Sequence, residues 1–280
     1  MVTERIFLKD IFPFLGEDDR NPYMDTYLPY NMTEMHRENN KRPCMVVCPG
    51  GGYGMCSQRE AEPIALKFLE DGYNVFVVYY SVAPNRFPNQ LREVAATMEL
   101  IYKNADNWNC DTDKIGIIGF SAGGHLAAHY STAYDCDEVR EVFPESKPVN
   151  ASVLSYPVIS IAFPECHEGS FINLLGHKPT LREEIEKFSC EYLVDENTPP
   201  AFLWHTAEDS CVPVKNTLAY AEALSKFKIP FEVHIYPFGC HGLSTCDNQT
   251  IDNITEVHIH NQRWINDAKK WLRLIFKGKL

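Results

Sequence analysis

The fold is decided by the stretch Lys114-Ile115-Gly116-Ile117-Ile118-Gly119-Phe120-Ser121-Ala122-Gly123-Gly124-His125-Leu126-Ala127-Ala128. The isoleucines at its start predict a buried strand, and the Ala- and Leu-rich run after Gly124 predicts a helix. Between them lies the tight turn Gly119-x-Ser121-x-Gly123. Side chains at 119 and 123 would collide with the neighbouring strand and helix, so glycine is needed there. The turn then lifts the Ser121 hydroxyl clear of the sheet, beside the positive end of the following helix.

The position of this turn predicts a nucleophilic serine. A G-x-S-x-G pattern is common by chance, but between a strand and a helix it is typical of a nucleophile elbow. The alternative is a glycine-rich turn whose serine only caps the helix. We favour the nucleophile, because the partners that such a serine needs follow downstream in the right order.

The composition is that of a globular protein. With 280 residues, 45% of them hydrophobic and 23% charged, the chain suits one large α/β domain over residues 1–280. The balance of 26 basic and 38 acidic residues gives a net charge of −12, which disfavours nucleic acid and anionic membranes as partners. No apolar run is long enough to span a membrane, and the first ten residues lack the pattern of a secretory signal. We therefore expect a cytoplasmic location.

Neither a metal nor a cofactor is expected. Without an export signal, the ten cysteines are interpreted as reduced and mostly buried thiols. No C-x-x-C pair occurs, and no His/Cys cluster has the spacing of zinc ligands. The triplet Gly50-Gly51-Gly52 would suit a phosphate-binding loop. However, no Lys-Ser/Thr follows it and the G-x-G-x-x-G spacing is absent, which argues against a nucleotide site.

Strands and helices alternate along most of the chain. The expected strands are 23–28, 43–49, 74–80, the run before Gly119, 151–157, 201–206 and 231–236. The expected helices are 59–71, 91–108, the run after Gly124, 181–193, 214–227 and 257–276. The first strand is expected at an antiparallel edge. This alternation predicts an α/β fold, a mostly parallel central sheet with helices on both faces. Residues 158–193 are expected to form a short cap-like insertion over the carboxyl ends of the strands, where such sheets bind ligands.

Two residues downstream can activate the serine. A serine hydroxyl needs a base to take its proton, and the base needs an acid to orient it. His241 follows the last expected strand on a glycine-flanked loop, and Asp209 follows the strand before it. The order Ser121, Asp209, His241 is that of α/β-hydrolases. Glu208 is the alternative acid. The remaining candidates for the base lie in expected helices or strands and are interpreted as structural: His125, His205, His234, His258 and His260.

Backbone amides can supply the third requirement, which is a set of donors for the oxyanion formed on acyl attack. The N–H of Ala122 directly follows the nucleophile. The triplet Gly50-Gly51-Gly52 follows an early strand and resembles an HGGG-type loop with Pro49 in place of the histidine. We assign Gly51 and Gly52 together with Ala122. Which two of the three glycines donate stays open.

With these residues in view, the chain resembles the α/β-hydrolase esterases related to hormone-sensitive lipase. More narrowly, it is similar to a branch of acetyl-xylan and feruloyl esterase-like proteins. The segments that carry the resemblance are 49–53, 59–65, 80–84, 88–91, 119–127 and the loops of Asp209 and His241. It spans about residues 43–245. The lipase relatives have histidine where this chain has Pro49, which favours the carbohydrate-esterase-like branch.

The resemblance implies hydrolysis of short-chain acyl esters. Acetyl groups on xylo-oligosaccharides or related carbohydrates are the expected substrates, and a small-molecule ester is the expected partner. Tyr53, Met55, Phe87 and Trp204 could line a sugar or acyl pocket, or pack in the core. The outer strands and the last helix could also pair two copies into a homo-oligomer.

Two other functions are consistent with the same residues. A serine peptidase or amidase uses the same triad on the same fold. A typical oligopeptidase, however, needs a gating domain for which 280 residues leave no room. A catalytically inactive binding module on the hydrolase fold is the second alternative. Such modules usually lose the serine or the histidine, whereas here all three positions are filled.

Overall fold

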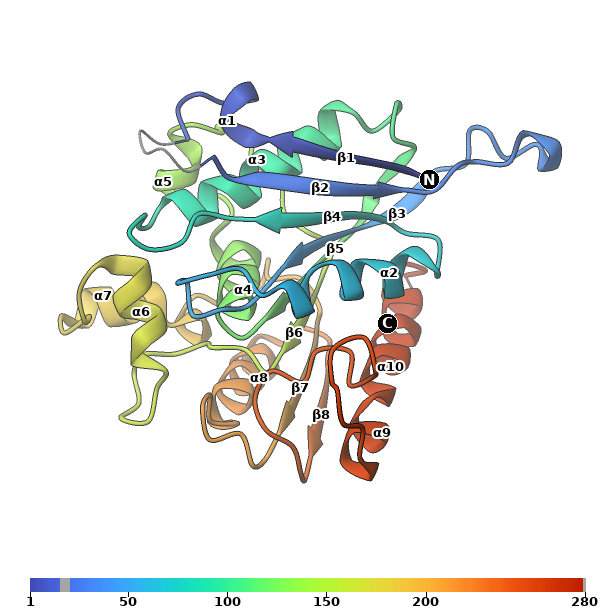
Figure 1. Ribbon diagram of the computed structural model, residues 1–280. Coiled ribbons are helices and arrows are strands. Elements are labelled where there is room, and N and C mark those ends of the chain that lie inside the picture. The colour runs from blue at the N-terminus through green and yellow to red at the C-terminus, as the bar shows by residue number, and fades with distance from the viewer. Residues whose placement is uncertain (16–20, 279–280) are drawn as a thin grey trace.

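The computed structural model describes residues 1–15 and 21–278 of the chain (Figure 1). Its strands are β1 (Val2–Phe7), β2 (Tyr23–Leu28), β3 (Arg42–Cys48), β4 (Asn74–Tyr79), β5 (Cys110–Phe120), β6 (Ala151–Ser155), β7 (Ala201–Thr206) and β8 (Phe231–Tyr236). Its α-helices are α1 (Leu8–Ile11), α2 (Glu62–Leu69), α3 (Asn89–Lys103), α4 (Ala122–Ala133), α5 (Asp137–Arg140), α6 (Glu168–Leu175), α7 (Arg182–Phe188), α8 (Lys215–Phe227), α9 (Glu256–Asn261) and α10 (Arg263–Ile275). Short 3₁₀ turns lie at η1 (Thr33–Met35), η2 (Gln58–Glu60) and η3 (Cys190–Tyr192).

One sheet joins all the described strands, in the order β1-β2-β4-β3-β5-β6-β7-β8. The first two strands are antiparallel to their neighbours, and the pairs from β4 to β8 are parallel. This confirms the predicted α/β-hydrolase fold with a mostly parallel sheet. Because β4 and β5 lie on opposite sides of β3, the chain leaves a crevice at the carboxyl ends of the central strands.

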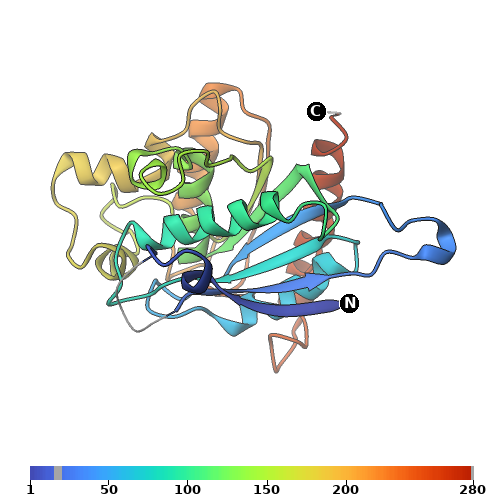
Figure 2. The same ribbon diagram turned by 90° about the horizontal axis from the view of Figure 1, so that it is seen from above.

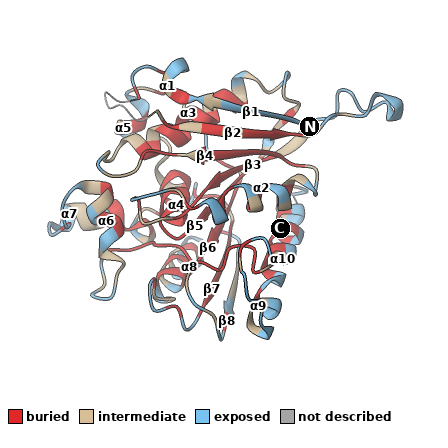
Figure 3. Ribbon diagram, viewed as in Figure 1, coloured by how far each residue is buried: buried red, intermediate tan, exposed pale blue. Residues whose placement is uncertain are grey.

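Helices cover both faces of the sheet, and each face has its own apolar core. On one face α2 and α10 pack through residues such as Phe68 and Trp264. On the other face α3, α4 and α8 pack through residues such as Leu126 and Leu224. Figures 1 and 2 show these helices on either side of the twisted sheet. Successive side chains of a strand point to opposite faces, so the central strands must be apolar throughout. Figure 3 shows them buried along almost their whole length.

The antiparallel edge of the sheet differs from the prediction. Residues 23–28 form a strand, but β2 lies between β1 and β4 and is therefore not the edge. The outer strand is β1, whose residues are mostly exposed. An exposed edge strand is held by backbone hydrogen bonds, so it needs no apolar alternation that a sequence pattern could reveal.

Four expected helices are shorter or divided in the structure. The segment 91–108 corresponds to α3, which ends at Lys103. The segment 59–71 begins with η2 and becomes helical only at α2, and 181–193 divides into α7 and η3. The segment 257–276 is divided between α9 and α10. Two of these breaks fall beside side chains that bond to other segments. Ser189 Oγ accepts a hydrogen bond from Ile161 N (3.1 Å), and Asn261 Nδ2 donates to Phe238 O (2.9 Å).

The segment 158–193 lies beside α4, on the side toward which β3 and β4 run (Figure 1). Asn173 Nδ2 on α6 donates to the carbonyl of Gly52 (2.9 Å). The carbonyl of Phe188, at the end of α7, accepts a hydrogen bond from His125 Nε2 on α4 (3.0 Å). The segment expected to form the insertion is thus attached both to the glycine loop and to the helix that follows Ser121.

All ten cysteines are free thiols, and half of them are fully buried. The exposed ones are Cys211 and Cys240, in the loops that carry Asp209 and His241. Within residues 1–15 and 21–278, no helix combines the length and the apolar character that crossing a bilayer requires.

Candidate active site

Ser121 occupies a strained turn between β5 and α4. Its backbone has φ 53° and ψ −119°, outside the regions that side chains normally favour, at a cost of roughly 1–3 kcal/mol. A Cβ at Gly119 would overlap the backbone of Gly123, and one at Gly123 would overlap the carbonyls of Cys48 and Pro49. The two glycines therefore let the turn form directly against the central strand.

His241 lies between the serine and the acid. Its Nε2 is 2.8 Å from Ser121 Oγ, and its Nδ1 is 2.6 Å from Asp209 Oδ2. A carboxylate only accepts, so the proton of the neutral imidazole belongs on Nδ1. The lone pair of Nε2 then faces the serine hydroxyl, which donates to it. The three residues predicted from chain order thus meet at one point, although they are far apart in the sequence.

The Asp209 carboxylate is surrounded by donors. Its Oδ1 accepts from the amides of Cys211 and Val212, both at 2.9 Å. The Oδ2 also lies 3.3 Å from Nε2 of His205. Burial opposes ionisation, but the hydrogen bonds from His205 and His241 outweigh it and hold the pKa of Asp209 well below its usual range. The side chain therefore stays an anion that can orient His241.

His205 contributes to this arrangement, although from the sequence it was expected only as a structural residue of a strand. It is fully buried in β7. Its Nε2 lies 2.8 Å from the carbonyl of Val212 and its Nδ1 lies 2.8 Å from Thr217 Oγ1. A carbonyl accepts, so Nε2 carries the proton and can also point to Asp209. No sequence pattern predicts this contact between His205 and Asp209, because it depends on the conformation of the loop after β7.

Glu208, the alternative acid, does not contact the histidine. It is exposed, and its Oε2 accepts a hydrogen bond from the amide of Gly239 (3.2 Å). The structure therefore places Asp209, and not its neighbour, beside His241.

The glycine loop presents unused amides next to the serine. The N–H of Gly50 donates to Glu60 Oε2 (2.9 Å), so this amide is already engaged. Gly51 and Gly52 have φ of 124° and 62°, a backbone that favours glycine. Among the described residues, the amides of Gly51, Gly52 and Ala122 donate to no protein group. Of the three glycines that the sequence left open, Gly50 is thus the one whose N–H is occupied.

Glu60 connects two of the loops around the site. Its Oε1 accepts from the hydroxyl of Tyr156 (2.6 Å), and that hydroxyl accepts from the amide of Ser244 (2.9 Å). The same carboxylate accepts from Gly50 through its other oxygen, so it joins the glycine loop to the loop after His241. Burial raises the pKa of Glu60, and these hydrogen bonds partly offset the rise. Sequence reasoning missed this role, since nothing along the chain distinguishes Glu60 from Glu62.

A cavity of about 410 Å³ opens over the serine. The side chains and backbone that line it come from the glycine loop, the insertion and the two loops that carry the histidine and the acid: Gly51, Gly52, Met55, Ser57, Arg59, Glu60, Ser121, His167, Cys211, His241 and Gly242. His167 is the contribution of the insertion, and its Nδ1 lies 2.8 Å from Ser170 Oγ. Burial lowers the pKa of His167, with a further contribution from nearby His241.

The four aromatic or sulfur-containing residues considered for the pocket separate into two groups. Met55 lines the cavity. Tyr53 and Trp204 are buried in the two cores, and Phe87 stacks on His129. Of these four residues, Met55 is therefore the one that contributes to the wall of the pocket.

His125 lies one turn into α4 and is fully buried, as befits the structural role expected from the sequence. The Tyr53 hydroxyl donates to its Nδ1 (2.8 Å), and its Nε2 donates to the Phe188 carbonyl. Burial lowers its pKa to about 4, and that of its neighbour His129 to about 3. This imidazole joins the elbow helix, the glycine loop and the insertion.

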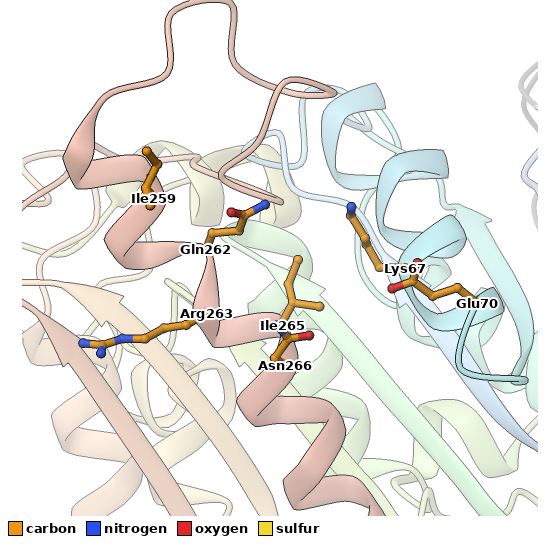
Figure 4. A pocket seen from close by; sticks show the side chains of 7 residues that line it. All are labelled: Lys67, Glu70, Ile259, Gln262, Arg263, Ile265 and Asn266. Carbon is orange, nitrogen blue, oxygen red and sulfur yellow. The ribbon is translucent and has the colours of Figure 1, made fainter.

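A second cleft, of about 390 Å³, lies between α2 and the helices α9 and α10 (Figure 4). Lys67 and Glu70 line one side, and Gln262, Arg263 and Asn266 belong to the other. Lys67 pairs with Asp247, and Glu70 pairs with Lys269. None of the predicted site residues lines this cleft.

The sheet order and the elbow define an α/β-hydrolase. Within this class, the chain belongs to the BD-FAE family, whose model matches residues 24–224. The acetyl ester-xyloside bifunctional hydrolase from Caldicellulosiruptor lactoaceticus has a similar structure, with a TM-score of 0.83 and 34% identity. That match covers 99% of this chain and 97% of the other.

Two curated relatives are longer than this chain. Endo-1,4-beta-xylanase B from Butyrivibrio fibrisolvens is 40% identical over 233 residues, which are 80% of this chain and 36% of the relative. An acetylxylan esterase from Xylanibacter ruminicola is 32% identical over 232 residues, 80% of this chain and 44% of the relative. The chain thus spans less than half the length of either. Together these similarities confirm the resemblance to α/β-hydrolase esterases of the acetylxylan esterase-like branch.

Proposed function

We propose that this protein is a serine carboxylesterase that removes short acyl groups, with acetyl as the expected one, from xylo-oligosaccharides or related carbohydrates. The observation that carries the proposal is the imidazole of His241, which lies 2.8 Å from Ser121 Oγ and 2.6 Å from Asp209 Oδ2. The substrate class rests on the similarity to an acetylxylan esterase and to an acetyl ester-xyloside hydrolase.

The first half of the reaction acylates Ser121. His241 Nε2 takes the hydroxyl proton while Ser121 Oγ attacks the ester carbonyl. The imidazolium is stabilised by the Asp209 anion, whose carboxylate accepts from Nδ1. When the tetrahedral intermediate collapses, the carbon–oxygen bond to the alcohol breaks and His241 returns the proton to the leaving oxygen.

The second half releases the acid. His241 takes a proton from water, the resulting hydroxide attacks the acyl-serine, and the proton returns to Ser121 Oγ as the bond breaks. The net change is one ester and one water converted into one alcohol and one carboxylic acid. In both halves the oxyanion is expected to accept from the amides of Gly51, Gly52 and Ala122, which donate to no group in the described part of the chain and need no reorganisation.

The insertion 158–193 is proposed as a cap on this pocket. Its support is His167, which lines the cavity, and the hydrogen bond from Asn173 to the glycine loop. A cap held in this way would limit the room for the acyl and alcohol groups, in keeping with a short acyl group.

Serine replacement tests the proposal. Ser121→Ala should lower kcat for 4-nitrophenyl acetate and for acetylated xylo-oligosaccharides by on the order of 10⁴ and abolish fluorophosphonate labelling. Ser131→Ala is the matched control, since Ser131 lies on the same helix and, within the described part of the chain, its hydroxyl bonds only to the carbonyl of Ala127. Hydrolysis by Ser121→Ala at the parent rate would refute the mechanism. Activity on aminoacyl anilides without activity on esters would favour an amidase, and absence of labelling in the parent would favour a binding module.

A further inference from the structure

Arg59 stands at the wall of the pocket with a free guanidinium. It belongs to η2, is exposed, and lines the same cavity as Ser121. Its Nη2 lies 3.4 Å from the position that a Cβ would take at Gly242, the residue after His241. Among the described residues, this guanidinium forms no hydrogen bond and no ion pair, although acidic residues outnumber basic ones by 38 to 26.

The other charged groups around the cavity are already engaged. Glu60 is 3% exposed, and its two carboxylate oxygens accept from Gly50 and Tyr156. The pocket also receives the amino ends of two helices, because Ser121 precedes α4 and His167 precedes α6. Helix amino ends carry partial positive charge. Among the described residues that line the pocket, the full charge without a protein partner is therefore the positive charge of Arg59, in a protein whose net charge is −12.

The position of Arg59 indicates which part of an ester it meets. During acylation His241 protonates the leaving oxygen, so the alcohol must lie on the histidine side of the scissile bond. Arg59 lies on that side, against Gly242, whereas Gly51 and Gly52 receive the carbonyl oxygen. A planar guanidinium matches a carboxylate through paired hydrogen bonds.

We propose that Arg59 binds a carboxylate on the alcohol part of the ester, so that the substrates are acyl esters of acidic oligosaccharides, such as those that carry a uronic acid. This inference rests on the proposed esterase function and specifies its substrate class. Arg59 is exposed, so water and salt weaken the contact, and a contribution of about threefold in kcat/KM is expected.

The test compares two substrates, acetylated xylo-oligosaccharides with and without a uronic acid substituent. The quantity measured is the ratio of kcat/KM for the acidic substrate to kcat/KM for the neutral one. Arg59→Gln should lower this ratio about threefold, mainly through KM, and Arg59→Lys should retain part of the preference. Raising the salt concentration to about 1 M should lower the parent ratio in the same direction.

Arg37→Gln is the matched control. Arg37 is exposed and lies before β3, at the opposite end of that strand from the glycine loop. The Arg37→Gln substitution removes the same unit of positive charge as Arg59→Gln. It therefore distinguishes a local contact of Arg59 from a long-range attraction of anions. Its ratio should equal that of the parent.

The outcomes separate this inference from the function on which it rests. If neither substrate is hydrolysed, the esterase proposal fails. If both are hydrolysed and Arg59→Gln leaves the ratio unchanged, the carboxylate site is refuted while the esterase stands. An equal fall of the ratio in Arg37→Gln would also refute it. A third substrate, 4-nitrophenyl hemisuccinate, carries its carboxylate on the acyl part. If Arg59→Gln lowered kcat/KM for this substrate alone, the assignment of the carboxylate to the alcohol side would be overturned.

Discussion

Acid should destabilise this protein through His125, and the structure sets the size of the effect. The imidazole is fully buried, and burial lowers its pKa from about 6.5 to about 4. Between these values the unfolded chain binds a proton that the folded chain does not. The contribution to stability is therefore complete above pH 6.5 and is lost as the pH falls toward 4. The whole difference amounts to about 3 kcal/mol, of which about 2 kcal/mol is lost between pH 7 and pH 5.

The assay is urea unfolding followed by tryptophan fluorescence at pH 7, 6 and 5. His125→Gln keeps an amide that can donate to the carbonyl of Phe188 but does not titrate. We expect this variant to be less stable than the parent at pH 7 and to lose about 2 kcal/mol less between pH 7 and pH 5. Part of the pH dependence should remain, because His129 is also buried, with its pKa lowered to about 3.

The control is His36→Asn, at an exposed left-handed position outside the core that asparagine tolerates. Its unfolding free energy should follow that of the parent at all three pH values. If His125→Gln and the parent lost stability in parallel, the imidazole would not be held neutral by burial, and the reasoning would be wrong.

Three further substitutions test the site. Asp209→Asn should leave an amide that donates to His241, favour the other tautomer and lower kcat by roughly 10³–10⁴ with the fold intact by circular dichroism; an unchanged kcat would contradict the role of the acid. Gly123→Ala should unfold the elbow or abolish fluorophosphonate labelling. Gly169→Ala is its control, because the nearest atom to the added Cβ belongs to His167, at 3.9 Å; this variant should keep the parent's melting temperature or exceed it. Glu60→Gln should cost about 1–3 kcal/mol in urea unfolding and lower kcat more than it raises KM, since one bonded donor loses its acceptor; a stability equal to the parent's would remove the proposed connection.

Chain order and local pattern determined much of this protein in advance. The glycines at 119 and 123 are a local steric requirement, so the elbow is visible in the sequence. The apolar runs predict central strands buried on both faces, and the run Phe231–Tyr236 became β8 with the predicted bounds. Where strands are parallel, the loops after them meet at one edge, so Ser121, Asp209 and His241 could be expected to lie near one another.

Only the tertiary structure decided the contacts that depend on how loops curl. Glu60 bonds to Gly50, and His205 approaches Asp209, through loops whose course no periodic pattern in the sequence predicts. The same holds for the free guanidinium of Arg59, which a loop places at the pocket wall. The edge strand β1 is held by backbone pairing, which is independent of side-chain pattern. A sequence records the local steric and apolar requirements of each segment, whereas the partner of a buried polar group is set by whichever segment packs against it.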